Sequence, residues 1–165
     1  MLRIAICDDE QEAVESHKKA VEAALGLCRA VGEIITYTRS DNLFCDIVED
    51  GFHFDLILLD IEMPGMDGME LARLLRGKGD RTEIIFVTGI PDYAPEGYDL
   101  EAVSYLVKPV KRERLCTALD RAREKAGRRN AILAPVCAGE LERIYVSDIS
   151  FLEGAGHETI LRKRD

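Results

Sequence analysis

Five short apolar runs separated by helical patterns constrain the fold of this 165-residue chain more than any other feature. The runs are expected to be strands, at Leu2–Cys7, Glu33–Tyr37, Phe54–Asp60, Glu83–Thr88 and Ala102–Val107. Several have continuously apolar interiors, such as Leu56–Leu59 and Ile84–Val87, as in parallel strands that are buried on both faces. Strands that alternate with helices form a parallel sheet covered by helices on both sides. The sequence therefore predicts an α/β fold with a doubly wound, five-stranded parallel sheet.

The segments between the strands have the spacing of amphipathic helices. Helices are expected over Glu12–Cys28, after Ser40 in a segment carrying Leu43, Phe44, Ile47 and Val48, over Gly68–Arg76, within Tyr93–Leu100 and over Lys111–Ala126. Ser40 has a residue type that favours the N-cap position of the second helix. Pro95 and Gly97 weaken the fourth helix.

The pattern changes after residue 126, which predicts a domain boundary. Residues 1–126 form the expected first domain, and Gly127–Asn130 is expected to be a linker. Residues 131–165 hold short strand-like runs at Ala131–Cys137, Glu142–Val146, Ile149–Leu152 and Thr159–Leu161. A β-rich extension of this size is too small to bury a core of its own.

Composition argues against several classes of protein. No run approaches the ~20 apolar residues of a membrane span, and the chain enters a strand pattern at once without a signal peptide, so a cytoplasmic protein is expected. The net charge is −9, which disfavours nonspecific nucleic-acid binding and suits a protein that binds cations and partner proteins. The five cysteines lack CxxC spacing, which argues against a zinc site or a disulfide framework.

Polar side chains follow four of the expected strands. Asp8 and Asp9 follow the first, Asp60 ends the third, Thr88 ends the fourth and Lys108 follows the fifth. An open parallel sheet binds its ligands at the carboxyl ends of its strands. We therefore expect three carboxylates, one hydroxyl and one ammonium around a single pocket. Carboxylates so close together repel each other and require a cation, a proton or a catalytic purpose.

This set resembles the receiver domain of two-component response regulators over residues 1–126. The residues that carry the resemblance are Asp8-Asp9, Asp60 with Met63-Pro64-Gly65-Met66-Asp67-Gly68, Thr88, and Tyr105 with Lys108-Pro109. The resemblance implies a flavodoxin-like sheet with strand order 2-1-3-4-5. It also makes Lys108-Pro109 a candidate for a cis peptide bond.

The resemblance implies that Asp60 accepts a phosphoryl group from a sensor histidine kinase. A carboxylate can attack phosphorus as a nucleophile. Mg²⁺ is the implied cofactor, because it suits an all-oxygen site that also holds phosphoryl oxygens. Its implied ligands are Asp9, Asp60 and the backbone carbonyl of Glu62, with Asp8 acting through a water molecule.

The resemblance also implies a switch. Lys108 neutralises phosphoryl oxygens as a point charge, and Thr88 donates a hydrogen bond to the phosphoryl group. Tyr105 then rotates inward, and a homodimer forms through a surface within Tyr93–Ala126. Gly89 leaves space beside Thr88, which is expected to ease access to the site. Beyond its own phosphorylation and dephosphorylation, the chain is not expected to be an enzyme.

The segment from Arg143 to Gly154 resembles the start of a LytTR-type DNA-binding domain. Its two-strand start and the run Asp148-Ile149-Ser150-Phe151-Leu152-Glu153 carry this resemblance. The chain ends before most of such a domain, so DNA binding is expected only of a complete output domain that controls transcription.

Two other functions stay open from the sequence. A phosphatase of the haloacid-dehalogenase type also uses an aspartate nucleophile and Mg²⁺, but it favours a second aspartate where this chain has Glu62. A non-phosphorylated interaction module is the other, although the complete set of polar strand-end residues argues against it. His17, His53 and His157 match no ligand spacing, so packing or surface roles are expected for them.

Overall fold

The computed structural model describes residues 1–27, 30–89, 100–129, 131–135, 141–145, 149–155 and 158–163. The chain divides into two compact units, Met1–Arg123 and Glu124–Asp165. Within the described ranges, no helix combines the length and the apolar character needed to cross a membrane.

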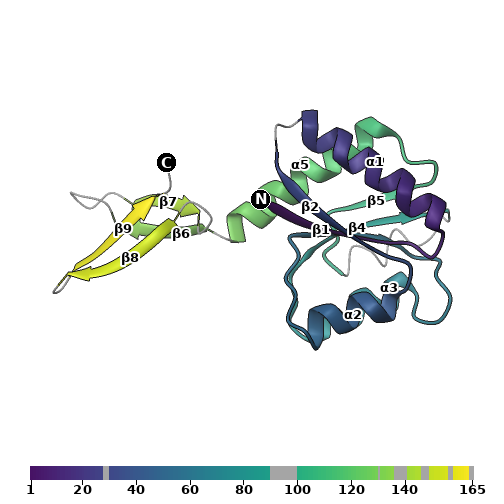
Figure 1. The fold of residues 1–165 in the computed structure, drawn as a ribbon, viewed down its shortest axis with the longest axis horizontal. Helices are drawn as coiled ribbons and strands as arrows, with labels where there is room; N and C mark the ends of the chain where they lie inside the picture. The colour runs from purple at the N-terminus through teal and green to yellow at the C-terminus, as the bar shows by residue number, and fades with distance from the viewer. Residues whose placement is uncertain are drawn as a thin grey trace. The chain divides into compact units, whose positions relative to one another are not determined.

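A five-stranded parallel sheet lies at the centre of the first unit (Figure 1). Its strands are β1 (Leu2–Cys7), β2 (Gly32–Tyr37), β3 (Leu56–Asp60), β4 (Glu83–Thr88) and β5 (Ser104–Val107). Their order across the sheet is β2-β1-β3-β4-β5, and every neighbouring pair is parallel. The predicted doubly wound sheet with order 2-1-3-4-5 is confirmed.

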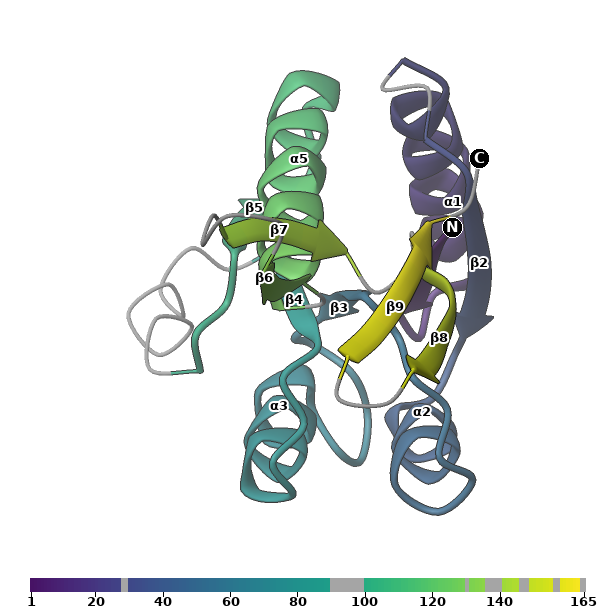
Figure 2. The same ribbon diagram turned by 90° about the vertical axis from the view of Figure 1, so that its left-hand side faces the viewer.

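Helices cover both faces of the sheet. They are α1 (Gln11–Leu27), α2 (Ser40–Val48), α3 (Gly68–Gly77) and α5 (Arg112–Arg129). Helices α1 and α5 lie on one face, and α2 and α3 lie on the other (Figures 1 and 2). The predicted helix within Tyr93–Leu100 lies almost wholly outside the described residues.

Two apolar clusters, one on each face, make up the core. Alternate residues of a strand point to opposite faces, so in β3 Ile57 and Leu59 pack toward α2 and α3 while Leu56 and Leu58 pack toward α1 and α5. Strands β1 and β4 divide their side chains in the same way. Full burial of one large apolar side chain contributes about 1.5–3 kcal/mol. The interiors of the central strands are therefore apolar at every position, because each face of the sheet is buried in one of the two clusters.

The structure corrects two expectations about helix ends. Arg39, not Ser40, is the N-cap of α2, because the Ser40 hydroxyl donates a 2.6 Å hydrogen bond to the carbonyl oxygen of Met66. Helix α5 continues to Arg129, so residues 127–129 are helical rather than a linker. One glycine costs a helix only about 1 kcal/mol, so Gly127 does not end α5. The division into domains at residue 126 stays a prediction.

The second unit contains two antiparallel strand pairs. Strand β6 (Ala131–Pro135) pairs with β7 (Leu141–Tyr145), and β8 (Ile149–Ala155) pairs with β9 (Glu158–Lys163). The expected short β-rich extension is therefore present. Large apolar side chains remain exposed on the second pair, at Phe151, Leu152 and Ile160.

Candidate functional site

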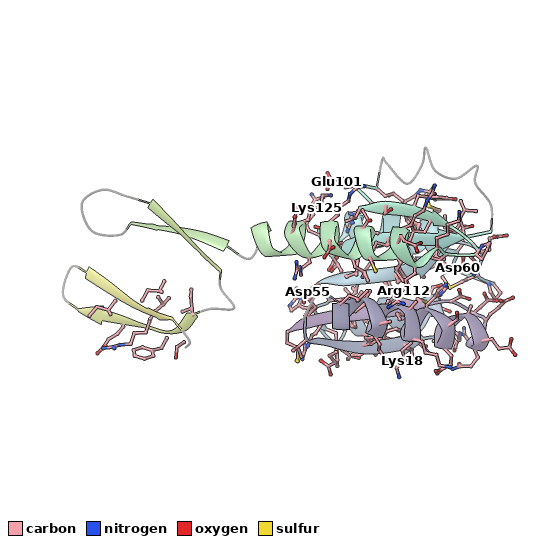
Figure 3. The ribbon with its side chains drawn as sticks, turned by 90° about the horizontal axis from the view of Figure 1, so that it is seen from above. Lys18, Asp55, Asp60, Glu101, Arg112 and Lys125 are labelled. Atoms are coloured by element: carbon pink, nitrogen blue, oxygen red, sulfur yellow. The ribbon has the colours of Figure 1, made fainter. Side chains whose placement is uncertain are left out.

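Carboxylates from two central strands meet at the carboxyl edge of the sheet. Asp60 is the last residue of β3, and Asp8 and Asp9 follow β1 directly. One oxygen from each of the three lies within 4.8 Å of the others. Asp8 and Asp60 are buried and Asp9 is exposed. Figure 3 shows Asp60 at one end of the sheet and Asp55, which precedes β3, at the other.

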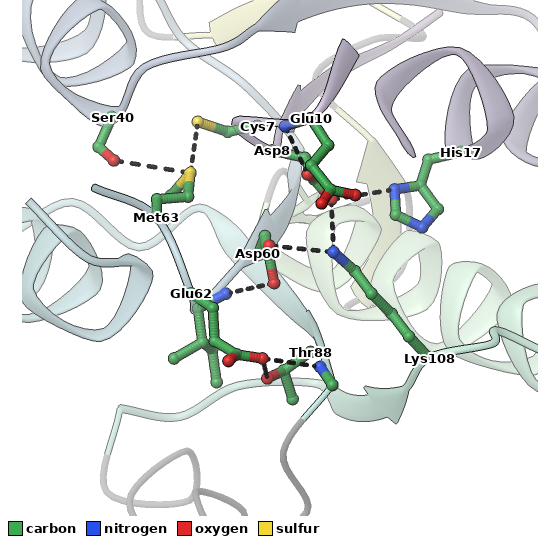
Figure 4. Close-up of polar contacts among 12 residues, drawn as sticks. Cys7, Asp8, Glu10, His17, Ser40, Asp60, Glu62, Met63, Thr88 and Lys108 are labelled. Carbon is green, nitrogen blue, oxygen red and sulfur yellow. Dashed lines mark hydrogen bonds and ion pairs between the residues drawn. The ribbon is translucent and has the colours of Figure 1, made fainter. Parts of the chain in front are cut away.

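The Lys108 ammonium lies between the two buried carboxylates (Figure 4). Its Nζ is 2.9 Å from Asp8 Oδ2 and 3.0 Å from Asp60 Oδ2. The backbone N–H of Lys108 donates a 2.7 Å hydrogen bond to the carbonyl of Thr88, which fixes the chain as it leaves β5 beside β4. The Lys108-Pro109 peptide bond is cis, as the resemblance implied.

Burial and charge act in opposite directions on these groups. Burial raises the pKa of Asp60, and Asp8 raises it further, while the hydrogen bond from Lys108 lowers it; the net direction is upward. Burial lowers the pKa of Lys108, but its hydrogen bonds to Asp8 and Asp60 outweigh this, so the pKa is raised overall. Lys108 therefore stays charged and offsets the repulsion between the two buried acids.

The loop after β3 holds Asp60 in place, and the sequence run that ends at Gly68 explains its shape. Gly65 has a φ of +82°, a conformation that side chains disfavour. Asp67 is the N-cap of α3, and its side chain accepts a 2.7 Å hydrogen bond from the backbone N–H of Glu70. Gly68 packs directly on the backbone carbonyl of Asp60. The run from Met63 to Gly68 therefore positions the loop that follows Asp60, the candidate phosphoacceptor.

The Glu62 side chain makes contacts that the sequence did not indicate. Its Oε2 accepts hydrogen bonds from Thr88 Oγ1 at 3.3 Å and from the Gly89 backbone N–H at 3.1 Å (Figure 4). A Cβ atom on Gly89 would lie 3.0 Å from the same oxygen. The expected open space beside Gly89 is therefore partly filled by the Glu62 carboxylate.

His17 lies closer to the site than expected. Its side chain is largely buried on α1, and its Nδ1 is 3.8 Å from Asp8 Oδ2. Burial lowers the pKa of His17, although Asp8 acts to raise it. The spacing of Val14, His17 and Val21 places all three on the buried face of α1. That periodicity is the sequence signal that could have placed His17 at the site.

Tyr105, the predicted switch residue, is half-buried on β5. Its ring lies 6.4 Å from that of Phe86, measured between centroids and in a tilted arrangement. It packs against the apolar cluster on the α2 and α3 face of the sheet. Tyr105 therefore contacts β4 at Phe86, two residues before Thr88.

The sheet order, the acidic cluster and the strand-end lysine together define a receiver-type α/β protein. A family model described as the response regulator receiver domain matches residues 4–120. The chain therefore belongs to the response regulator receiver domain family, whose members act in two-component systems and are not conventional enzymes.

Relatives and solved structures agree with this assignment. The chain is 32% identical over 163 residues to the transcriptional regulatory protein NatR of Bacillus subtilis, covering 98% of this chain and 67% of that protein. It is 31% identical over 97 residues to the sensory transduction protein LytT of Oceanobacillus iheyensis, covering 52% of this chain and 39% of that protein. The response regulatory domain of protein mrkE from Klebsiella pneumoniae has the same fold, with a TM-score of 0.68 at 23% identity, covering 77% of this chain and 99% of that one. The chain thus spans two thirds or less of the length of these two relatives.

Proposed function

We propose that this receiver accepts a phosphoryl group on Asp60 from a sensor histidine kinase and controls transcription through a LytTR-type output domain. The observation that carries the proposal is the buried Asp60 carboxylate, held 3.0 Å from Lys108 beside two further acids. The names of two relatives, the transcriptional regulatory protein NatR and the sensory transduction protein LytT, support the proposed control of transcription. DNA binding belongs to a complete output domain, and a cytoplasmic location stays a prediction.

The chemistry is an in-line phosphoryl transfer. A bond forms between an Asp60 oxygen and phosphorus, and the bond from phosphorus to the kinase histidine nitrogen breaks, with the electron pair staying on that nitrogen. Lys108 stabilises the charge on the phosphoryl oxygens, and the Thr88 hydroxyl donates to one of them afterwards. Mg²⁺, when bound, would supply further positive charge for the same oxygens.

The residues present fit Mg²⁺. All donors offered by Asp8, Asp9 and Asp60 are carboxylate oxygens, which is the ligand type that Mg²⁺ prefers. The backbone carbonyl of Glu62, in the loop after β3, is the further proposed ligand. Asp9 is exposed, so the cluster opens to solvent and to a phosphoryl donor.

Phosphorylation by a small-molecule donor tests the proposal directly. After incubation with acetyl phosphate and Mg²⁺, intact-mass spectrometry should show one added phosphoryl group per chain, and a chelator should prevent the addition. If wild-type protein gains no phosphoryl mass and binds no beryllofluoride, which mimics the phosphoryl group, the chain is an interaction module instead. The phosphatase alternative is set aside by the family assignment.

Mg²⁺ is expected to stabilise the protein. Binding to the folded state at about 100 times the Kd adds about 2.7 kcal/mol to the free energy of unfolding, and this should appear as a higher Tm. Asp9→Asn should weaken the effect, while relief of repulsion should keep its Tm without Mg²⁺ at or above that of the wild type. Glu22→Gln, which removes an exposed acid on α1 outside the cluster, is the control and should respond like the wild type. An unchanged wild-type Tm over a Mg²⁺ titration would contradict the metal site.

Phosphorylation is expected to change the association state. It adds about −1.5 to −2 charges at Asp60, so Thr88 should move toward that charge and Tyr105 should fill the space that it leaves. Light scattering with beryllofluoride should then show a homodimer whose amide exchange is slowed along α5. Asp60→Asn with beryllofluoride is the control and should remain unchanged. If association and exchange in α5 are unaffected in the wild type, the proposed dimer surface is wrong.

A further inference from the structure

The Glu62 side chain accepts two hydrogen bonds at the end of β4. The Thr88 hydroxyl and the Gly89 N–H converge on one oxygen, Glu62 Oε2, at 3.3 and 3.1 Å. Glu62 lies two residues after Asp60 in the loop at the edge of the sheet, and Figure 4 shows its carboxylate against the end of β4. Thr88 is completely buried, so its hydroxyl is not available to bulk water.

The phosphoryl group of the proposed function needs the same hydroxyl. A threonine hydroxyl has one hydrogen and can donate it to one strong acceptor at a time. The present acceptor, a carboxylate oxygen, is anionic like a phosphoryl oxygen, so the two compete for the same donor. A phosphoryl group on Asp60 would also repel the Glu62 carboxylate in the same loop. Thr88 can therefore donate to the phosphoryl group only after its contact with Glu62 has broken.

We propose that the Glu62 side chain acts as a latch, a contact that holds the end of β4 in its resting position until Asp60 is phosphorylated. This role is separate from the metal contact proposed for the Glu62 backbone carbonyl. In the unphosphorylated protein its carboxylate holds Thr88 and Gly89, so the end of β4 keeps its resting position. The phosphoryl group displaces it and takes over Thr88. This inference rests on the proposed function, because it concerns the step that follows phosphoryl transfer to Asp60. The latch lowers the affinity of the site for a phosphoryl group and keeps the unphosphorylated population inactive.

Removal of the charge tests the latch. Glu62→Gln keeps the shape and an amide oxygen, while Glu62→Ala removes the acceptor altogether. Both variants should bind beryllofluoride more tightly than the wild type, on the order of tenfold for Glu62→Ala, because a charge-assisted hydrogen bond no longer competes. Glu70→Gln, an exposed acid on α3, is the matched control and should bind like the wild type.

A second measurement reads the contact without any phosphoryl group. Amide hydrogen exchange at Gly89 should be faster in Glu62→Ala than in the wild type, because its N–H loses its acceptor. Unchanged exchange at Gly89, or beryllofluoride binding that is equal to or weaker than wild type in both variants, would overturn the latch. Wild-type protein that binds no beryllofluoride would instead overturn the proposed function. Thermal melts of the variants show whether an effect on binding comes from loss of folding.

Discussion

Asp60→Asn is expected to reduce phosphoryl incorporation from acetyl phosphate to background, a loss of at least about 100-fold. The substitution replaces one carboxylate oxygen by an amide NH₂ and removes the negative charge that attacks phosphorus. The side chain keeps its size at a position that is 4% exposed. One of two repelling buried carboxylates becomes neutral, while Lys108 keeps its 2.9 Å contact with Asp8. The variant should therefore fold with a Tm close to that of the wild type.

The matched control for this variant is Asp55→Asn at the other end of β3. Asp55 Oδ2 accepts a 2.8 Å hydrogen bond from the backbone N–H of Arg3, far from the carboxyl edge of the sheet. This control should gain phosphoryl mass like the wild type. A phosphoryl adduct that persists in Asp60→Asn would move the acceptor to another acid, with Asp8 and Asp9 the first to be examined by peptide mapping.

The fold could be predicted from the sequence because the physical cause of the pattern is local. Strands β3 and β4 are buried on both faces, so their interiors, Leu56–Leu59 and Ile84–Val87, are continuously apolar. The helices alternate with them in a simple order, and right-handed crossovers leave few topologies. The carboxyl ends of parallel strands lie at the same edge of the sheet, so the sequence predicts that the acids at those ends cluster there.

Side-chain partners far apart in the sequence could not be predicted in this way. The Ser40 hydroxyl contacts Met66, which is 26 residues away, and this contact replaces the expected cap. The contacts of Glu62 with Thr88 and Gly89 likewise span 26 and 27 residues. Such contacts depend on the rotamers and loop conformations of the folded protein, and neither can be deduced from the spacing of residues along the chain.

The structural role of Arg76 could not be predicted from the sequence for the same reason. The sequence places it only at the end of a helix, yet its guanidinium donates to the backbone carbonyls of Leu100, Asp80 and Thr82 at 2.9–3.1 Å. It therefore ties α3 to the start of β4 and to the chain that enters β5. An arginine with three carbonyl partners is a structural element that composition and periodicity do not distinguish from a surface arginine.

Gly68→Ala is expected to be strongly destabilising although it adds only one methyl group. A Cβ atom there would overlap the carbonyl oxygen of Asp60 and lie 2.9 Å from its carbonyl carbon. It would also lie 3.0 Å from the Cα of Ile61, so all three nearest atoms are backbone and no rotamer change can relieve the overlap. Overpacking of this kind should cost about 3 kcal/mol or more. For a domain of this size the Tm should fall by roughly 10 °C.

Gly77→Ala, at the other end of α3, separates this clash from a general effect of changing glycine. Apart from the adjacent residues and the backbone of α3 itself, no heavy atom of the described residues lies within 4 Å of a Cβ at that position. The change should therefore be neutral or stabilise by up to about 1 kcal/mol. Thermal melts of both variants and the wild type provide the comparison. Because Gly68 contacts the backbone that carries the proposed phosphoacceptor, Gly68→Ala should also slow phosphorylation at temperatures where it remains folded. A Gly68→Ala protein that melts with the wild type would mean that the loop after β3 can move away from Asp60 at little cost, and the rigid placement of that carboxylate would then be wrong.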